Sequence, residues 1–337
     1  MTAFSPTLGE LRNVVDAELT DFLAGRRAAL PEAGELIVEI QRLFEAGGKR
    51  LRPAFCYWGY RAAGKPHSAA IVKSAASLEL LHTFAIVHDD IMDQSSTRRG
   101  VPTSFALGGV SFALLVGDLA LVLADDAIMA SDFPPPALAG AFAAYSRMRQ
   151  EVIAGQFLDV KMAGDPLVTE EEARRVAVLK SGRYSIQEPL AIGAALAGAP
   201  SALEDGLAGY GEPLGEAFQL RDDLLGIFGD SSRTGKPIDS DIREGKRHVL
   251  YAKTVASLSG GERDDFTRLW GAGADLGAED IVHLRELTEC SGARAATEGL
   301  LKALTATAYE RLRGLPLDGD ARGALEALTR ESTDRQS

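Results

Sequence analysis

The sequence predicts an all-α protein folded as one domain over residues 1–337. Ala and Leu dominate the chain, and the alternation of apolar and polar residues that marks a strand is scarce. Apolar residues instead recur at three- and four-residue spacing, which is the period of an amphipathic helix. Gly and Pro separate these runs, so we expect roughly ten or more helices. One such run is Leu36, Ile37, Ile40, Leu43 and Phe44.

The boundaries of the helices follow from residues that start or end them. Thr169 followed by three glutamates predicts a helix start, because a hydroxyl cap and early acidic residues suit a helix N-terminus. We expect disordered tails over about residues 1–10 and 330–337, which are polar or contain proline. The expected breaks are Gly47–Gly48, Gly64–Pro66, Gly100–Pro102, Phe133–Pro136, Gly164–Pro166, Gly198–Pro200 and Gly229–Pro237.

Bulk composition argues against several classes of function. The 337 residues carry a formal net charge of −12, whereas a nucleic-acid-binding protein normally has a basic patch. Only Cys56 and Cys290 are present, so we expect no disulfide framework and no cysteine metal site, which fits a reducing, cytoplasmic compartment. The N-terminus lacks a signal-peptide pattern. The apolar stretch 111–129 is interrupted by three aspartates, so we expect a buried helix and no stable membrane insertion.

A helix predicted from Ser74 to Asp93 ends in three carboxylates. Asp89 and Asp93 lie about 40° apart around this helix, one turn from each other on the same face. Such a pair repels unless a cation lies between the carboxylates, and Mg²⁺ is typically held by one or two carboxylates plus substrate phosphates. The pair could also be a solvated helix end or part of a structural ion-pair network.

The surroundings of this acidic cluster favour a ligand. His82 lies seven residues before Asp89, on nearly the same face of the apolar helix. Arg98 and Arg99 follow after a short turn, and the arginine fork binds diphosphate oxygens in pairs. Carboxylates beside arginines therefore suggest a metal-chelated diphosphate.

A second acidic pair, Asp222 and Asp223, also lies on an apolar helical stretch. Basic residues occur at four places in or near Gly-containing breaks, and each place taken alone could be an ordinary solvated loop. Two aspartate clusters on separate helices, together with four basic sites in one acidic chain, are more specific. The basic residues are Lys49, Arg50 and Arg52; Arg98 and Arg99; Lys180 and Arg183; and Lys236, Lys246 and Arg247.

In their order and spacing, these motifs resemble those of trans-isoprenyl diphosphate synthases, the polyprenyl synthetase family, and most of all its short-chain geranylgeranyl diphosphate synthases. The resemblance covers nearly the whole chain. It implies a single large bundle of mostly antiparallel helices around a deep central cavity, and usually a homodimer. The matching segments are GGKRLRP, LLHTFAIVHDDIMDQSSTRRG, LLVGD, GQFLD, LKSGRYS, FQLRDDLLGIFGD and TGKPIDSDIREGKRHVL.

The resemblance also implies roles for individual residues around about three Mg²⁺ ions. Asp89 and Asp93 would bind two ions with support from Asp90, and Asp222 would bind the third. Asp223 and Asp230 would support this third ion through water, although the family often has another aspartate where this chain has Gly226. The allylic diphosphate would be bound by Arg98, Lys180 and Lys236, and isopentenyl diphosphate by Lys49, Arg52, His82 and Arg99, with Lys246 as a further substrate-binding residue and Gln219 near the reacting carbons.

The implied reaction is head-to-tail elongation of an allylic diphosphate by isopentenyl diphosphate, with electrostatic help for the leaving diphosphate. The chain shows no pattern for a protein nucleophile, and this reaction needs none. In this family, bulk on the helix before the first aspartate cluster limits product length. Phe84 is the one aromatic beside Ala85, with no insertion in the motif, and this resembles a C20 pattern. Leu81 is a further candidate for this role, whereas Phe84 could also be plain core.

Four alternatives stay open. The product could be farnesyl diphosphate (C15) or a C15 and C20 mixture. A class I terpene cyclase shares the fold, but it normally carries an N-D-x-x-S-x-x-x-E motif, where this chain has DDLLGIFGD. A non-catalytic subunit of a heteromeric prenyltransferase tends to lose the acidic motifs, which this chain keeps in its first cluster. A metal-free helical scaffold would leave the clustered charges unexplained.

Overall fold

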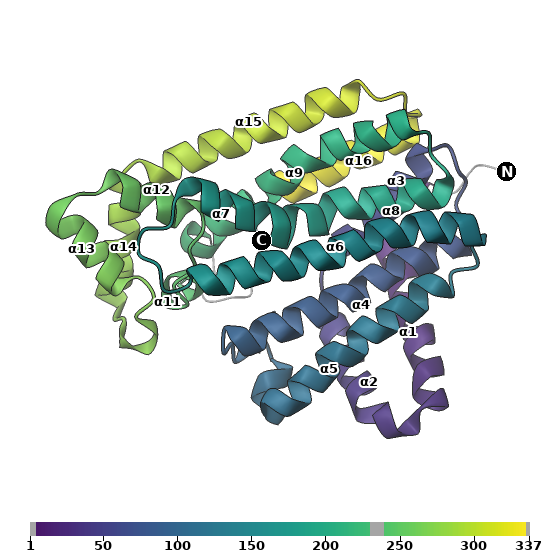
Figure 1. The fold of residues 1–337 in the computed structure, drawn as a ribbon, viewed down its shortest axis with the longest axis horizontal. Coiled ribbons are helices and arrows are strands. Elements are labelled where there is room, and N and C mark those ends of the chain that lie inside the picture. Colours follow the sequence, from purple (N-terminus) through teal and green to yellow (C-terminus); the bar gives the residue numbers. More distant parts are fainter. Residues whose placement is uncertain (1–4, 230–238, 335–337) are drawn as a thin grey trace. The chain divides into compact units, whose positions relative to one another are not determined.

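The computed structural model describes residues 5–229 and 239–334, and these are almost entirely helical (Figure 1). This confirms the all-α prediction. Among the described residues, the strands form one hairpin of two residues each. The chain separates into two compact units, which are described one at a time. Unit 1 contains residues 1–147, 185–208 and 312–328, and unit 2 contains residues 148–184, 209–311 and 329–337.

Unit 1 is built from the N-terminal helices and from parts of later ones. Its core contains large buried aromatic side chains such as Trp58 and Tyr57. The elements are α1 (Leu8–Ala29), η1 (Pro31–Ala33), α2 (Gly34–Glu45), α3 (Leu51–Ala62), α4 (Ala69–Met92), β1 (Thr97–Arg98), β2 (Val101–Pro102), α5 (Ser104–Met129) and α8 (Glu188–Ala197), with the N-terminal parts of α6 (Pro135–Met162) and α9 (Ser201–Phe228) and most of α16 (Gly319–Thr333).

Side-chain caps start the helices of unit 1 that carry or support the site. Thr7 caps α1 in a capping box with Glu10. Ser68 and Thr103 accept a backbone N–H at the start of α4 and α5. Helix α1 begins at Leu8 and α16 continues to Thr333, so residues 8–10 and 330–333, at the inner edges of the predicted tails, are helical or lie in a helix end.

Close backbone contacts in unit 1 depend on small residues. A Cβ at Gly59 would lie 2.4 Å from the Leu190 carbonyl oxygen, and one at Gly193 would lie 2.0 Å from the Cys56 carbonyl oxygen. These two glycines therefore let α3 and α8 pack backbone to backbone. Helices α4 and α5 run alongside each other (Figure 1), and a Cβ at Gly117 of α5 would lie 2.3 Å from the His88 imidazole of α4.

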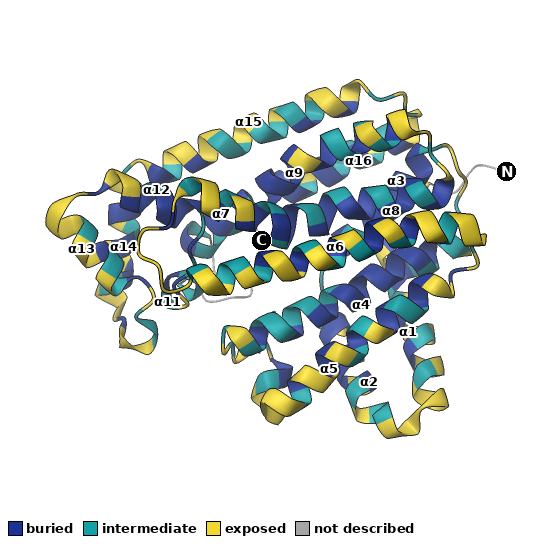
Figure 2. Cartoon of the chain, in the orientation of Figure 1, coloured by how far each residue is buried: buried dark blue, intermediate teal, exposed yellow. Residues whose placement is uncertain are grey.

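Helices α4 and α5 are both long and apolar enough, by composition, to cross a membrane. The apolar window of α4 is 78% buried inside the structure, as expected for a core helix, but that of α5 is only 28% buried. In one copy of the chain, the expectation that this stretch forms a buried helix was therefore wrong, because most of the apolar window of α5 is not buried. Figure 2 shows exposed residues recurring along α5, and they include Leu107, Val110, Leu114, Leu115, Val122 and Met129.

Unit 2 contains the shorter helices of the C-terminal half. Its elements are the C-terminal parts of α6 and α9, α7 (Glu170–Val176), most of the π-helix η2 (Ala177–Gln187), α11 (Ser240–Arg243), α12 (Val249–Ser257), α13 (Gly260–Leu269), η3 (Gly273–Asp275), α14 (Ala278–Cys290), most of α15 (Ala293–Arg313) and the end of α16. Thr169 caps α7 in a capping box with Glu172, which confirms that predicted helix start.

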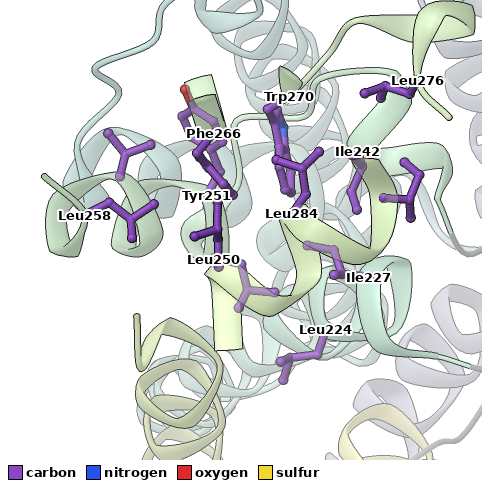
Figure 3. Packing of buried hydrophobic residues seen from close by; sticks show 13 residues of the cluster. Leu224, Ile227, Ile242, Leu250, Tyr251, Leu258, Phe266, Trp270, Leu276 and Leu284 are labelled. Atoms are coloured by element: carbon purple, nitrogen blue, oxygen red, sulfur yellow. The ribbon is translucent and has the colours of Figure 1, made fainter. Parts of the chain in front are cut away.

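An aromatic group forms the centre of the unit 2 core (Figure 3). The ring centroids of Tyr251, Phe266 and Trp270 lie 5.1–5.6 Å apart, and each such pair contributes about 0.5–1.5 kcal/mol beyond its buried area. Leu224 and Ile227 of α9 belong to the same cluster. The helix that carries the second aspartate pair is thus anchored by its apolar face.

Candidate active site

The C-terminal end of α4 places the first aspartate cluster as the helical period predicts. Helix α4 ends at Met92, and Asp93 is its C-cap, with its backbone N–H donating to the Asp89 carbonyl at 2.9 Å. Asp89 and Asp93 are half-buried, while Asp90 is 2% exposed. The three carboxylates therefore end a helix whose apolar window is largely buried.

The hairpin after α4 brings Arg98 back onto these carboxylates. Arg99 and Gly100 connect the two strands with φ of 52° and 77°, which is typical of a tight hairpin turn. Arg98 Nε donates to Asp90 Oδ1 at 2.8 Å, and its Nη2 donates to Asp89 Oδ2 at 3.2 Å. Burial alone would lower the pKa of Arg98, but Asp90 and Asp89 raise it above its ordinary value. Arg98 is therefore a firmly charged guanidinium beside the acidic cluster.

A second group in unit 1 is cationic. The guanidinium groups of several arginines surround His82. Burial is the main cause that holds the pKa of His82 well below its usual range, and the charges of Arg52 and Arg99 lower it further. Arg52 Nη2 donates to Ser185 Oγ at 2.8 Å. Arg99 donates to the Gly47 carbonyl and so lies over the loop that carries Lys49. Like charges gathered around a neutral imidazole are typical of a site for an anion, because a bound diphosphate would relieve their repulsion.

The three candidate chain-length residues lie on the same helix, and the structure distinguishes their environments. Phe84 and Leu81 are buried, whereas Ala85 is half-buried. The Phe84 ring meets the His88 ring edge-on, with centroids 4.8 Å apart. His88 Nε2 lies 3.4 Å from the Leu114 carbonyl of α5. Phe84 thus packs beside His88, which contacts α5.

Four residues before Phe84, the same helix borders a cavity. This cavity has a volume of about 150 Å³ and lies between α1, α4 and α5. Leu80 and Ala76 of α4 form part of its wall. The polar groups at the cavity are Glu18 and Lys73, and Lys73 Nζ pairs with Asp132 Oδ2 at 2.7 Å.

Unit 2 places Lys180 in the π-helix η2. Its Nζ donates to Asp159 Oδ2 at 2.6 Å. A Cβ at Gly155 of α6 would lie 2.5 Å from the Lys180 backbone nitrogen, so this glycine allows α6 to touch the backbone of η2. A π-helix is uncommon and frequently marks a functional segment.

The second aspartate pair lies near the C-terminal end of α9. Asp222 is half-buried, and Asp223 is 3% exposed. Gln219 Nε2 donates to Asp223 Oδ1 at 2.7 Å, while Asp223 Oδ2 is buried without a hydrogen-bond partner. Burial raises the pKa of Asp223 to about 8, and Asp241 adds to this shift. Such a carboxyl is suited to a bound cation or a donor that would compensate its charge.

The structure gives a reason why residue 226 is glycine. A Cβ at this position would lie 1.9 Å from Asp241 Oδ2 and 2.7 Å from Asp241 Cγ. The carboxylate of Asp241 therefore occupies the space that a side chain at position 226 would need. Asp241 comes from α11 and thus places a carboxylate against α9 where the resemblance led us to expect an aspartate on α9 itself.

Sequence reasoning missed three polar residues of this region: Asp159, Asp241 and His248. Asp159 was visible in the segment GQFLD, and its pairing with Lys180 explains its place there. His248 Nδ1 accepts the Tyr251 N–H at 3.2 Å as the cap of α12, which leaves Nε2 buried without a partner. Asp241 and His248 lie in the matching segment TGKPIDSDIREGKRHVL, but their places beside Gly226 and at the start of α12 come from the fold.

Two predicted cationic residues have different outcomes. Lys246 Nζ lies 3.7 Å from Glu244 Oε2, so its charge is partly compensated. Lys236 lies outside the described residues, as does Asp230 of the second acidic segment. Within residues 5–229 and 239–334, no group of three or more His, Cys, Asp or Glu side chains is arranged to hold a metal ion by itself. The predicted metal ligands Asp89, Asp93 and Asp222 offer carboxylate oxygens, the donors that Mg²⁺ takes together with substrate phosphates and water.

Comparisons with known proteins agree with these features. The family model described as Polyprenyl synthetase matches residues 35–281. The chain is 32% identical to a geranylgeranyl diphosphate synthase of Saccharolobus solfataricus over 97% of this chain and 96% of the relative. It is 38% identical to a (2E,6E)-farnesyl diphosphate synthase of Mycobacterium tuberculosis, over 73% of this chain and 68% of the relative.

A solved structure shares the fold over the full length. It is the geranylgeranyl pyrophosphate synthase of Corynebacterium glutamicum in complex with isoprenyl diphosphate and magnesium. Its TM-score is 0.93 at 34% identity, and the match covers 98% of this chain and 100% of that one.

Proposed function

Because the chain belongs to the polyprenyl synthetase family, we propose that it condenses isopentenyl diphosphate head-to-tail with allylic diphosphates and that its main product is geranylgeranyl diphosphate. The two units would together form one catalytic domain. The observation that carries this proposal is the pairing of Arg98 with Asp89 and Asp90, next to the cationic group around His82. One region thus offers carboxylates for a cation and guanidiniums for diphosphates.

The residues present fit magnesium as the cofactor, about three ions per site. Asp89 and Asp93 would hold ions at the end of α4 with support from Asp90, and Asp222 would hold one at α9. Asp223 and Asp241 would support the latter, with Asp241 in the space beside Gly226. Bound Mg²⁺ would neutralise negative charge on the leaving diphosphate and so ease cleavage of the allylic C–O bond.

The cationic side chains would bind the two substrate diphosphates. Arg98, Lys180 and Lys236 would hold the allylic diphosphate, with Lys246 nearby in sequence. Lys49, Arg52, His82 and Arg99 would hold isopentenyl diphosphate, with His82 neutral until the substrate brings negative charge. Because His82 lies among guanidiniums, a bound diphosphate would favour its protonated form and add a charged donor.

The reacting carbons need a dry and oriented setting. The carbon–oxygen bond of the allylic substrate breaks, the double bond of isopentenyl diphosphate attacks the allylic carbon, and a proton is lost to the released diphosphate. Gln219 would lie near these carbons, and its orientation is fixed by the hydrogen bond to Asp223. The apolar face of α4, including Leu81, Phe84 and Ala85, would bound the growing chain and keep water from the cationic carbon.

The decisive experiment is condensation with defined starters. The purified protein is incubated with Mg²⁺, isopentenyl diphosphate and C5, C10 or C15 allylic diphosphate, and product length is measured by mass spectrometry. We expect a dominant C20 product. Loss of condensation in Asp89→Asn and Asp93→Asn, with the fold retained, is expected if the acidic cluster has the proposed role. Failure of the folded wild-type chain with every starter would overturn the proposal.

Two further candidates differ in what they need from the site. A dominant C15 product is the alternative within the same enzyme class, and the relatives include both C15 and C20 synthases. A terpene cyclase would release a hydrocarbon or alcohol from a single allylic substrate and would have no use for the cationic group around His82. Consumption of isopentenyl diphosphate therefore separates the two classes.

We also propose that the active form is a cytoplasmic homodimer that covers the exposed face of α5. Five of these exposed apolar side chains, from Val110 to Met129, follow the non-helical residue Gly109 and lie within roughly 140° of the helix circumference, so they form one continuous face. Burying such a face between two copies would remove it from water. Light scattering of the wild type and of Leu115→Asp tests this, and a monomeric wild type at micromolar concentration would refute it.

A further inference from the structure

We propose that Arg50 is a positioning residue for the diphosphate site: its guanidinium fixes the loop Gly47–Lys49 in the shape that presents Lys49 and supports Arg99. The inference rests on the proposed function, because it assigns Lys49 and Arg99 to substrate binding. Arg50 itself would not touch the substrate.

The guanidinium of Arg50 is buried and joins three helices. Its side chain is 2% exposed. Nε donates to Asp16 Oδ1 of α1 at 2.6 Å, and Nη1 lies 3.2 Å from Glu79 Oε2 of α4. Nη2 donates to the Phe44 carbonyl in the last turn of α2 at 2.6 Å. Two carboxylates thus compensate its charge, although Arg50 also belongs to the arginines that lower the pKa of His82.

The same guanidinium also holds the loop. Nη1 of Arg50 donates to the Gly47 carbonyl at 3.1 Å, and Arg99 donates to the same oxygen. A Cβ at Gly48 would lie 2.7 Å from Arg50 Nη1 and 3.1 Å from Arg99 Nη1. The two guanidiniums therefore close directly over Gly48, and a loop that shifted would lose both contacts.

The backbone of this loop needs such support because it is strained. Gly47 and Gly48 have φ of 112° and 134°, and Arg50 has φ of 53°. A non-glycine residue in the left-handed region costs about 1 kcal/mol or more. Glycine would adopt the left-handed conformation at this position with a smaller backbone penalty than arginine does. The several hydrogen bonds of its side chain offset that cost, and together they determine where the Lys49 backbone lies.

The basic residues of this one motif therefore have different roles. In GGKRLRP, Lys49 and Arg52 are half-buried and would contact the diphosphate, whereas Arg50 between them is buried in the protein. Asp16 and Glu79, which lie 34 and 29 residues from Arg50 in sequence, become indirect determinants of substrate affinity. Weakening the contacts of Asp16 or Glu79 with Arg50 should lower the affinity for isopentenyl diphosphate more than that for the allylic diphosphate, because we propose that mainly other residues bind the allylic diphosphate.

The test is a split between the two Michaelis constants. In Arg50→Lys the charge is kept but the fork that reaches Asp16, Glu79 and two carbonyls is lost. We expect KM for isopentenyl diphosphate to rise roughly tenfold, which corresponds to about 1.4 kcal/mol. KM for the C15 allylic diphosphate and kcat at saturation should change by less than about threefold, or about 0.7 kcal/mol on the same scale. Asp16→Asn leaves the guanidinium in place and serves as the second variant if Arg50→Lys does not fold. It should raise KM for isopentenyl diphosphate by a smaller factor, again without a comparable change in KM for the allylic diphosphate.

A matched control separates positioning from general stability. Arg61 is also a buried arginine of unit 1, in the last turn of α3, with Nη1 donating to Tyr57 Oη at 3.1 Å and its guanidinium 5.4 Å from the centre of the Trp58 ring. Arg61→Lys should lower Tm without a selective change in either KM. Equal rises of both Michaelis constants in Arg50→Lys and Asp16→Asn, or no rise in a folded variant, would overturn the inference. A wild type that neither condenses nor binds isopentenyl diphosphate in calorimetry would instead overturn the proposed function, and the inference with it.

Discussion

Gly226→Ala is a substitution whose sign depends on one contact. In an ordinary exposed helix this change stabilises the fold by about 0.5–1 kcal/mol, because alanine loses less backbone entropy than glycine. At position 226 the new Cβ would lie 1.9 Å from Asp241 Oδ2 and 2.7 Å from Asp241 Cγ. The Asp241 carboxylate must therefore move, although its carbonyl is held by the Lys246 N–H at 3.0 Å.

The size of the effect follows from the two opposing terms. Forcing an extra methyl group into a filled space costs about 1–3 kcal/mol. After the helical gain is subtracted, we expect a net loss of about 1 kcal/mol and at most about 2.5 kcal/mol, or roughly 1–4 °C in Tm, because the unfolding entropy is about 2.1 cal/mol/K per residue in a chain of 337 residues. Gly299 of α15 is the matched control, since a Cβ there would meet nothing within 4 Å. Gly299→Ala should be stabilising by about 0.5–1 kcal/mol.

Thermal and urea unfolding of both variants, with and without Mg²⁺ and inorganic pyrophosphate, measure this difference. The double variant Gly226→Ala with Asp241→Ala should regain most of the helical gain, because the clash is gone. It should also lose part of the stabilisation by Mg²⁺ and pyrophosphate if Asp241 supports the ion. Equal stabilisation by Gly226→Ala and Gly299→Ala would refute the steric account of this glycine.

Three more measurements test other features. The pKa of His82 is lowered in the folded state, so the unfolded chain takes up the proton first and stability should decline as pH falls below about 6.5; His82→Gln should show a shallower decline between pH 7 and 5, and parallel curves would contradict this. Cys290 is exposed, whereas Cys56 is buried and burial raises the pKa of its thiol, so a thiol reagent should modify one cysteine in the native protein and both in denaturant; fast native labelling of two would be the contrary result. Phe84→Ala should lengthen the main product by one or more C5 units, because it removes a buried ring four residues from Leu80 at the cavity; it should also cost about 3–5 kcal/mol of stability, and an unchanged product length in a folded variant would refute the proposed role of Phe84.

Local rules explain which expectations the structure confirmed. Helical geometry predicts that Asp89 and Asp93 lie one helical turn apart, and they do so at the C-terminal end of α4. The cap at Thr169 and the glycine break before Lys49 depend on residues within a few positions, and both occur in the structure. Motif order and spacing were sufficient to identify the family, because they report the chemistry of a whole site.

Expectations that depend on packing between distant segments had a different outcome. Nothing near residues 111–129 indicates that α5 would leave a continuous apolar face exposed, because exposure depends on which helices cover it. The role of Phe84 within α4 also needed its neighbour, since His88 and α5 define the space around its ring.

The sequence by itself determined the all-α class, the helix caps and breaks, the acidic and basic residues of the candidate site, and family membership. Only the tertiary structure decided that Arg50 faces Asp16 and Glu79, that Asp241 fills the space beside Gly226, and that Lys180 lies in a π-helix paired with Asp159. The physical reason is the range of the interactions. Caps and helical faces are set by neighbours three or four residues away, whereas these pairs join segments 15 to 34 residues apart and exist only after the helices have packed.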